Sequence, residues 1–223
     1  MKITDHVHLV PDTVANVFIL IDPDGLTVID TGLPRSERKI LDYITNLGRS
    51  HHDVKRILIT HSDLDHVGSL AALQKASGAL TYASQIEAEA IAAGQNSRPP
   101  KPGFSMAKAI MAAMRPFYKA TPFQVAEYLT DGQVLPALGG LRVVETAGHS
   151  PGHVSLFAPG AGILFCGDSL VTDQNGIHGS RSAVTWEAEK AREAERKQAA
   201  LGARIVCPGH GPVVMEAGSK FKV

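Results

Sequence analysis

The sequence lacks an excess of charge of either sign. Lys and Arg together number 22, and Asp and Glu together also number 22, so the formal net charge at pH 7 is zero. A neutral chain has no general electrostatic attraction to nucleic acid or to an anionic membrane surface. We therefore expect neither a nucleic-acid partner nor a membrane partner.

Long apolar runs and cysteines are also scarce. Residues 1–6 contain no apolar core of signal-peptide length, and no uninterrupted apolar run approaches the ~20 residues that cross a bilayer. The two cysteines, Cys166 and Cys207, are far apart in the sequence, and each ends a strand-like run. In a chain without an export signal, buried free thiols are expected rather than a disulfide. These absences favour a cytoplasmic protein.

The 223 residues are expected to form a single domain, because no linker divides them. Short apolar runs rich in β-branched residues alternate with amphipathic stretches, which is typical of an α/β fold. Helices are predicted over residues 37–47, 66–76, 84–94 and 185–201. Strands are predicted over residues 17–21, 26–29, 57–60, 80–83, 141–145, 154–157, 163–166 and 205–207.

Side chains that can bind metals are concentrated directly after one predicted strand. His61, Asp63, Asp65 and His66 lie within six residues, immediately after the strand at 57–60. Carboxylates and imidazoles that are crowded together away from water repel one another or stay unpaired unless a cation lies among them. This loop is therefore the first candidate for a metal site.

Three more candidates follow other predicted strands. His149, Asp168 and His210 each come after a different strand, beside Gly or Pro residues that let the backbone turn sharply. In α/β proteins, sites assemble where the carboxyl ends of strands meet. Seven nitrogen and oxygen donors are too many for one tetrahedral ion, but they suit two ions that share a carboxylate. The pattern indicates a two-metal hydrolase.

Five motifs in order carry a resemblance to a known family. They are Val-Ile-Asp-Thr-Gly at Asp30, Thr-His-x-x-x-Asp-His at His61, Gly-His-x-x-Gly-His at His149, Gly-Asp at Asp168 and Pro-Gly-His-Gly at His210. With these motifs the chain resembles the metallo-β-lactamase superfamily. The resemblance implies an α/β fold of the αββα type over residues 1–223, a four-layer sandwich in which two mixed sheets are flanked by helices.

The resemblance also implies a role for each motif residue. Asp30 would support the ligand loop without touching a metal. One metal would be bound by His61, Asp63 and His149, the second by Asp65, His66 and His210, and Asp168 would bridge the two.

One position departs from the family pattern. The usual motif is His-x-His-x-Asp-His, and here Asp63 replaces the middle histidine. The additional carboxylate makes the site more anionic, which shifts the metal preference from zinc toward iron or manganese. We expect two divalent ions, with zinc first because it is prevalent in the family and iron or manganese as the competitors.

Two further histidines lie near the motifs. His153 is interpreted as a residue that holds a loop by hydrogen bonding rather than as a ligand. His178, in a Gly-rich loop beyond Asp168, is a candidate contact for the substrate.

One segment, at about residues 95–122, interrupts the alternation of strands and helices. It opens with a proline-rich stretch that cannot form regular structure, and then places Met106, Ile110, Met114 and Phe117 at helical spacing. This helical insertion is interpreted either as a lid that receives an apolar group of the substrate, or as a cap helix that packs on the core or on a second copy in a homodimer.

The expected activity is hydrolysis of an ester, lactone or thioester of a small molecule by a hydroxide that bridges the two metals. Asp65 is expected to orient this nucleophile while it binds its own metal. A phosphodiesterase is one alternative. Another is a non-haem iron oxidoreductase of the same superfamily, similar to persulfide dioxygenases or to di-iron oxygen reductases. The non-enzymatic alternative is a binding module that the metals brace.

Overall fold

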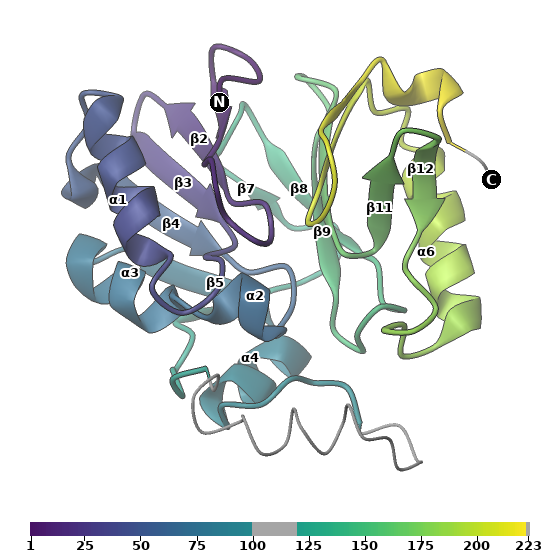
Figure 1. Cartoon of the computed structure of the whole chain (residues 1–223), viewed down its shortest axis with the longest axis horizontal. Coiled ribbons are helices and arrows are strands. Elements are labelled where there is room, and N and C mark those ends of the chain that lie inside the picture. The colour runs from purple at the N-terminus through teal and green to yellow at the C-terminus, as the bar shows by residue number, and fades with distance from the viewer. Residues whose placement is uncertain (100–119, 222–223) are drawn as a thin grey trace.

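Two six-stranded β-sheets lie face to face, and helices cover their outer faces (Figure 1). This computed structural model describes residues 1–99 and 120–221. Three helices, α1 (Glu37–Asn46), α3 (Leu70–Ser77) and α4 (Gln85–Ala92), pack on the first sheet. Helix α6 (Ala188–Ala199) packs on the second sheet. The layers are the αββα sandwich that the sequence predicts.

The first sheet has the strand order β1-β2-β3-β4-β5-β6. Its first three strands are antiparallel neighbours, and β3 to β6 are parallel. Parallel neighbours need crossover connections, which α1, α3 and α4 supply. The strands are β1 (Val7–Leu9), β2 (Phe18–Asp22), β3 (Gly25–Ile29), β4 (Val54–Leu58), β5 (Leu80–Ser84) and β6 (Glu127–Leu129).

The second sheet has the order β14-β13-β10-β9-β8-β7, and in it only β10 and β13 pair in parallel. A separate hairpin of β11 (Leu170–Asp173) and β12 (Gly176–Gly179) follows β10. The strands of the sheet are β7 (Val134–Leu135), β8 (Leu141–Glu145), β9 (Val154–Ala158), β10 (Ile163–Gly167), β13 (Ile205–Pro208) and β14 (Val214–Met215).

Strand β2 is apolar on both faces because it is covered on both sides. Ile19 packs among the helices on the outer face, whereas Phe18 and Leu20 point into the core between the sheets. The ring of Phe18 meets that of Phe165 on β10 in an edge-to-face contact, with the centroids 5.3 Å apart. This aromatic pair joins the two sheets across the central core.

The helix predicted over residues 66–76 is present, but it is divided into two helices. A short helix, α2 (Leu64–Val67), ends before Gly68, and α3 begins at Leu70. At Gly68 a Cβ atom would lie 2.4 Å from Cδ of Pro34, so a neighbouring loop passes too close for any side chain. The hydroxyl of Ser69 then accepts from the backbone N–H groups of Ser36 and Glu37 at the start of α1.

Other boundaries differ by less. The strand predicted at 57–60 runs from Val54 to Leu58, and the helix predicted at 185–201 begins only at Ala188. The sequence did not indicate six short strands, β1, β6, β7, β11, β12 and β14. Cys166 and Cys207 are free and buried, as expected.

The proposed insertion lies mainly outside the described residues. Met106, Ile110, Met114 and Phe117 all fall between the two described ranges, so their interpretation stays a prediction.

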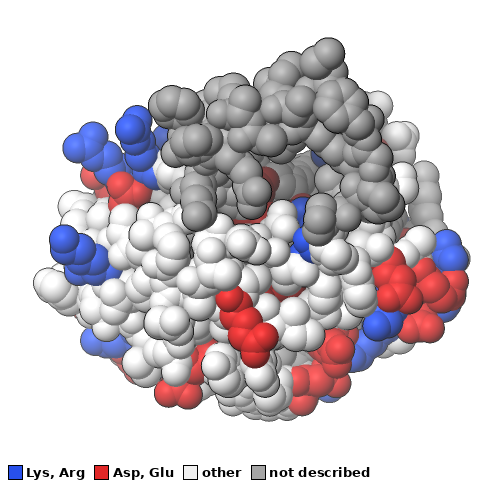
Figure 2. Space-filling view, turned by 90° about the horizontal axis from the view of Figure 1, so that it is seen from below, with Lys and Arg blue, Asp and Glu red and all other residues white. Residues whose placement is uncertain are grey.

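Basic and acidic side chains are interspersed on the face shown in Figure 2. None of the described helices has the length and apolar character needed to cross a membrane.

Replacing Phe165 by Ala should destabilise the fold strongly. Its ring is fully buried between the sheets, so truncation leaves a cavity and removes the contact with Phe18. We expect the free energy of unfolding to fall by about 3–5 kcal/mol in a urea titration. Val14→Ala, at a side chain that is 64% exposed, is the control and should change it by less than about 0.5 kcal/mol. Equal effects of the two variants would contradict this description of the core.

Candidate metal centre

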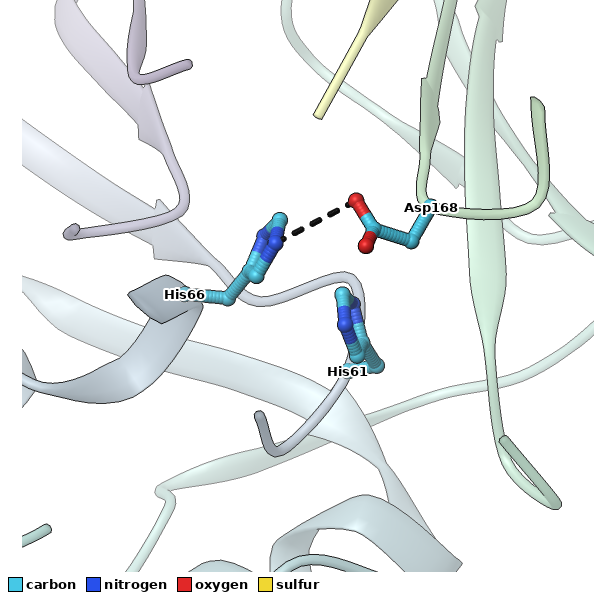
Figure 3. A group of neighbouring side chains, drawn as sticks. All are labelled: His61, His66 and Asp168. Atoms are coloured by element: carbon cyan, nitrogen blue, oxygen red, sulfur yellow. Dashed lines mark ion pairs between the residues drawn. The ribbon is translucent and has the colours of Figure 1, made fainter. Parts of the chain in front are cut away.

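Four chain segments converge at one edge of the space between the sheets. Helix α2, which follows β4, lies at the lower edge between the two halves of the molecule in Figure 1. The β8–β9 loop, the end of β10 and the end of β13 reach the same place from the second sheet. Figure 3 shows His61 and His66, from the first sheet's side, facing Asp168 at the end of β10. The structure thus brings all seven candidate residues together, in three overlapping groups.

The first group is His61, Asp63 and His149. Oδ2 of Asp63 lies 3.5 Å from Nε2 of His61 and 3.2 Å from Nε2 of His149. Both imidazoles are fully buried, and the Asp63 side chain is mostly buried. The donor atoms of the three residues lie within 4.8 Å of one another, so they can surround a single ion.

The second group is Asp65, His66 and His210. Oδ2 of Asp65 lies 3.1 Å from Nε2 of His210, and His66 is buried on α2. This group is closer to solvent than the first, since about a quarter of the His210 side chain is exposed. Its donor atoms also lie within 4.8 Å of one another.

Asp168 lies between the two groups. Its carboxylate oxygens are 3.3 Å from Nε2 of His66, 3.5 Å from Nε2 of His210 and 3.8 Å from Nε2 of His149. Gly209 allows this approach, because a Cβ atom there would lie only 2.3 Å from Oδ1 of Asp168. One carboxylate therefore faces both groups, as a bridging ligand must.

Unpaired polar atoms at the centre test whether the site suits a metal. In the described residues six buried side-chain nitrogen or oxygen atoms have no hydrogen-bond partner, and four of them are here: His61 Nε2, Asp63 Oδ1, His66 Nε2 and Asp168 Oδ1. Leaving a buried polar atom unpaired costs about 1–3 kcal/mol. Histidine nitrogens and carboxylate oxygens are donors that zinc, iron and manganese accept, so the residues fit divalent metals.

The carboxylates of the centre remain ionised. Burial alone would raise the pKa of Asp63, but close contacts with the imidazoles of His149 and His61 and the charge of Arg98 hold that pKa well below its ordinary value. Burial likewise opposes ionisation of Asp168, and the charge and hydrogen bond of His66 overcome it and lower its pKa. Anionic side chains in a buried site attract a cation.

Asp30 fixes the orientation of His66 and of the loop before it. Its Oδ2 atom lies 2.8 Å from Nδ1 of His66, which leaves Nε2 directed at the centre. The backbone N–H of Thr60 donates to Oδ1 of Asp30, and the Thr60 hydroxyl donates to both oxygens. Asp30 therefore contacts His66 and Thr60 on the side away from the donor atom Nε2 of His66.

His153 also contacts the centre from behind. Its Nε2 atom accepts a hydrogen bond from the backbone N–H of Asp168 at 3.1 Å, and Nδ1 lies 2.9 Å from the Thr146 hydroxyl. Burial lowers the pKa of His153 well below its ordinary value, in keeping with a neutral ring that accepts at Nε2. His178 instead pairs with Asp173 on the β11–β12 hairpin, and the three groups do not include it.

Glu87 is a central residue that the sequence reasoning missed. In the sequence it is only one residue near the start of the helix predicted over 84–94, where the side chain of Ser84 accepts from its backbone N–H. Its fully buried carboxylate turns inward, where it accepts hydrogen bonds from Ser62 N–H, the Ser150 hydroxyl and Gly152 N–H. Glu87 thus joins the loop of His61 and Asp63 to the loop of His149.

Arg98 was missed as well, since only its position in a proline-rich stretch distinguished it. Its guanidinium reaches the first group, with Nη2 on Oδ2 of Asp63 and Nη1 3.0 Å from Nε2 of His149. Nothing in the local sequence indicates this contact, because 35 and 51 residues separate the partners.

Two known proteins are similar to this chain in sequence over most of its length. The chain is 25% identical over 234 residues to the probable metallo-hydrolase YflN of Bacillus subtilis (strain 168). This alignment covers 97% of this chain and 87% of the relative. It is 26% identical to the atrochrysone carboxyl ACP thioesterase of Aspergillus fumigatus, over 93% of this chain and 54% of that protein.

A solved structure shares the fold. A metallo-beta-lactamase family protein from Thermus thermophilus superposes with a TM-score of 0.74 at 24% identity, over 98% of this chain and 78% of that one. The family model described as "Metallo-beta-lactamase superfamily" matches residues 10–210, which include every residue of the centre. The chain therefore belongs to the metallo-beta-lactamase superfamily.

Proposed function

We propose that this protein is a dinuclear metal-dependent hydrolase that cleaves an ester, lactone or thioester of a small molecule. The observation that carries the proposal is the set of four unpaired buried donor atoms among seven converging imidazoles and carboxylates. Relatives named as hydrolases, at about 25% identity, support metal-dependent hydrolysis in general. The named thioesterase among them supports acyl rather than phosphoryl chemistry.

The first group and the second group of donors would each hold one ion in this proposal. Asp168 faces both groups and would be shared between the ions. Asp30 and His153 would act through the ligands that they orient. The first ion would be held by His61, Asp63 and His149, and the second by Asp65, His66 and His210.

Two divalent ions in such a site supply an acidified water as nucleophile and polarise the oxygen of the scissile group. The protein's own part is to position and to accept protons. Burial opposes ionisation of Asp65, but the hydrogen bond to His210 lowers its pKa below the ordinary value. Asp65 is therefore a carboxylate near pH 7, and its second oxygen can accept a proton from the attacking water and orient it.

The metals are proposed to be zinc, with iron or manganese as the alternative that Asp63 favours. Three carboxylates, those of Asp63, Asp65 and Asp168, contribute to this donor set. Carboxylate oxygens suit the harder ions iron and manganese better than imidazole does. An iron-loaded protein that consumes O2 and shows no turnover of esters, lactones or thioesters would favour an oxidoreductase instead.

Asp168→Ala should remove at least one metal ion per chain. The variant deletes the carboxylate that faces both groups, so neither ion keeps a complete set of ligands. We expect elemental analysis to show the loss and a panel of esters, lactones and thioesters to show almost no turnover. Asp42→Ala, at an exposed position of α1, is the matched control and should keep both properties. Unchanged metal content in the Asp168 variant would exclude a bridging role.

Asp63→His should raise the proportion of zinc relative to iron and manganese. The substitution replaces a hard anionic donor by an imidazole and makes the site less anionic. The measurement is elemental analysis of wild type and variant purified from matched media without added metal. Asp42→His adds an imidazole on the exposed face of α1 and controls for adventitious binding. A metal ratio identical to that of wild type would mean that Asp63 does not set metal choice.

A further inference from the structure

The first group of donors already has a cation of the protein's own. The guanidinium of Arg98 contacts Oδ2 of Asp63 through Nη2 and lies 3.0 Å from Nε2 of His149 through Nη1. Nη1 also donates to the backbone carbonyl of Val184 at 2.5 Å. Arg98 therefore contacts two of the three residues that would hold an ion in the first group, while Oδ1 of Asp63 has no hydrogen-bond partner.

His149 cannot serve Arg98 and a metal at the same time. Nδ1 of His149 lies 3.0 Å from the Ser180 hydroxyl, and in the tautomer that donates there, Nε2 is left with a single lone pair. That lone pair accepts either an N–H of Arg98 or a metal ion. Binding of one therefore excludes binding of the other.

The guanidinium also relieves a cost within the first group. In the tautomer just described, Nε2 of His149 is an acceptor 3.2 Å from Oδ2 of Asp63, and Asp63 is an anion with little exposure to water. A cation between them removes the repulsion and pairs the buried charge. A metal ion would do the same, and two cations at one position would repel each other.

The backbone next to Arg98 is held in place. The N–H of Ser97 donates to the Ser62 hydroxyl at 2.8 Å, and the Ser97 hydroxyl donates to Glu87 at 2.8 Å. Glu87 in turn holds the His149 loop through Ser150. The backbone beside Arg98 is therefore fixed near the donors. Displacement of Arg98 by a metal ion would require movement of its side chain only.

The second group has no such competitor among residues 1–99 and 120–221. Asp65 pairs with His210, and Asp168 pairs with His66, His149 and His210, but neither carboxylate pairs with a Lys or Arg of these ranges. The two groups thus differ in what a metal must displace.

We propose that Arg98 is a displaceable internal cation that occupies the His61–Asp63–His149 position and must be expelled before a metal binds there. Metal affinity is accordingly lower at this position than at the Asp65–His66–His210 position, and Arg98 determines whether the protein holds one ion or two. The inference rests on the proposed function in so far as both positions bind metals.

The test is a titration of the metal-free protein with Zn²⁺ in competition with a chromophoric chelator. Wild type should bind two ions with unequal affinities. Arg98→Gln removes the charge that competes with the metal. It should lower the dissociation constant of the more weakly bound Zn²⁺ ion by about tenfold or more, because a charged hydrogen bond no longer has to be broken. Arg192→Gln, at an exposed arginine that pairs with Glu189, is the matched control and should leave both affinities unchanged.

A conservative variant at the same position keeps the test decisive if Arg98→Gln does not fold. Arg98→Lys keeps the charge, but one ammonium cannot span Asp63 and His149 as the planar guanidinium does. Its weaker affinity should lie between those of wild type and Arg98→Gln. Asp65→Asn should abolish the tighter binding and Asp63→Asn the weaker, which assigns the affinities to the two positions.

The chain's single tryptophan offers an independent signal. The backbone N–H of Trp186 donates to the carbonyls of Gly148 and His149, and Arg98 bonds to the carbonyl of Val184 two residues earlier. Tryptophan fluorescence should change as the second Zn²⁺ equivalent binds to wild type, and much less in Arg98→Gln.

Each failure has a distinct meaning. If wild type binds two ions of equal affinity, or if Arg98→Gln leaves the weaker affinity unchanged, the role of Arg98 is overturned and the dinuclear hydrolase stands. If wild type binds no Zn²⁺, Mn²⁺ or Fe²⁺, the proposed function fails, and the role of Arg98 fails with it.

Discussion

The structure depends on a concentration of buried anions and imidazoles that a cation must balance. Asp63 and Asp168 stay ionised although they are largely buried, and several neighbouring donor atoms have no partner. In the described residues, the positive charges of protonated or basic side chains balance part of this negative charge. Burial opposes protonation of His66, but the charges of Asp30 and Asp168 raise its pKa well above the ordinary value. Arg98 balances Asp63 in a similar way.

The two sheets provide the rigid frame that makes this concentration tolerable. Each sheet contributes loops to one edge, and the apolar core between the sheets, with Phe18 and Phe165 in contact, fixes the distance between those loops. Buried acids then tie the loops to the frame. Asp30 joins the ends of β3 and β4, and Glu87 joins α4 to loops from both halves. The donors are therefore positioned before any ligand binds, which lowers the entropic cost of forming the site.

The two halves of the centre are not equivalent. One group is deeply buried and in contact with Arg98, whereas the other includes the partly exposed His210. Asp63, which lies where the resemblance noted in the sequence leads us to expect a histidine, is the residue that makes the first group attractive to a guanidinium. An imidazole at that position would offer no negative charge to pair with Arg98. Asp63 and Arg98 are thus two parts of one arrangement.

The sequence by itself determined eight of the fourteen strands in the described residues, the family and the seven metal-capable residues. Apolar β-branched runs and glycine-rich turns are local signals, and each of the seven metal-capable residues follows a predicted strand. Only the tertiary structure decided the break at Gly68, the inward turn of Glu87 and the contact of Arg98 with Asp63 and His149. The contacts of Glu87, its neighbour Ser84 and Arg98 join residues that are 25 to 68 positions apart in the sequence, and the break at Gly68 depends on the close approach of another loop. No local pattern of residues could therefore predict them.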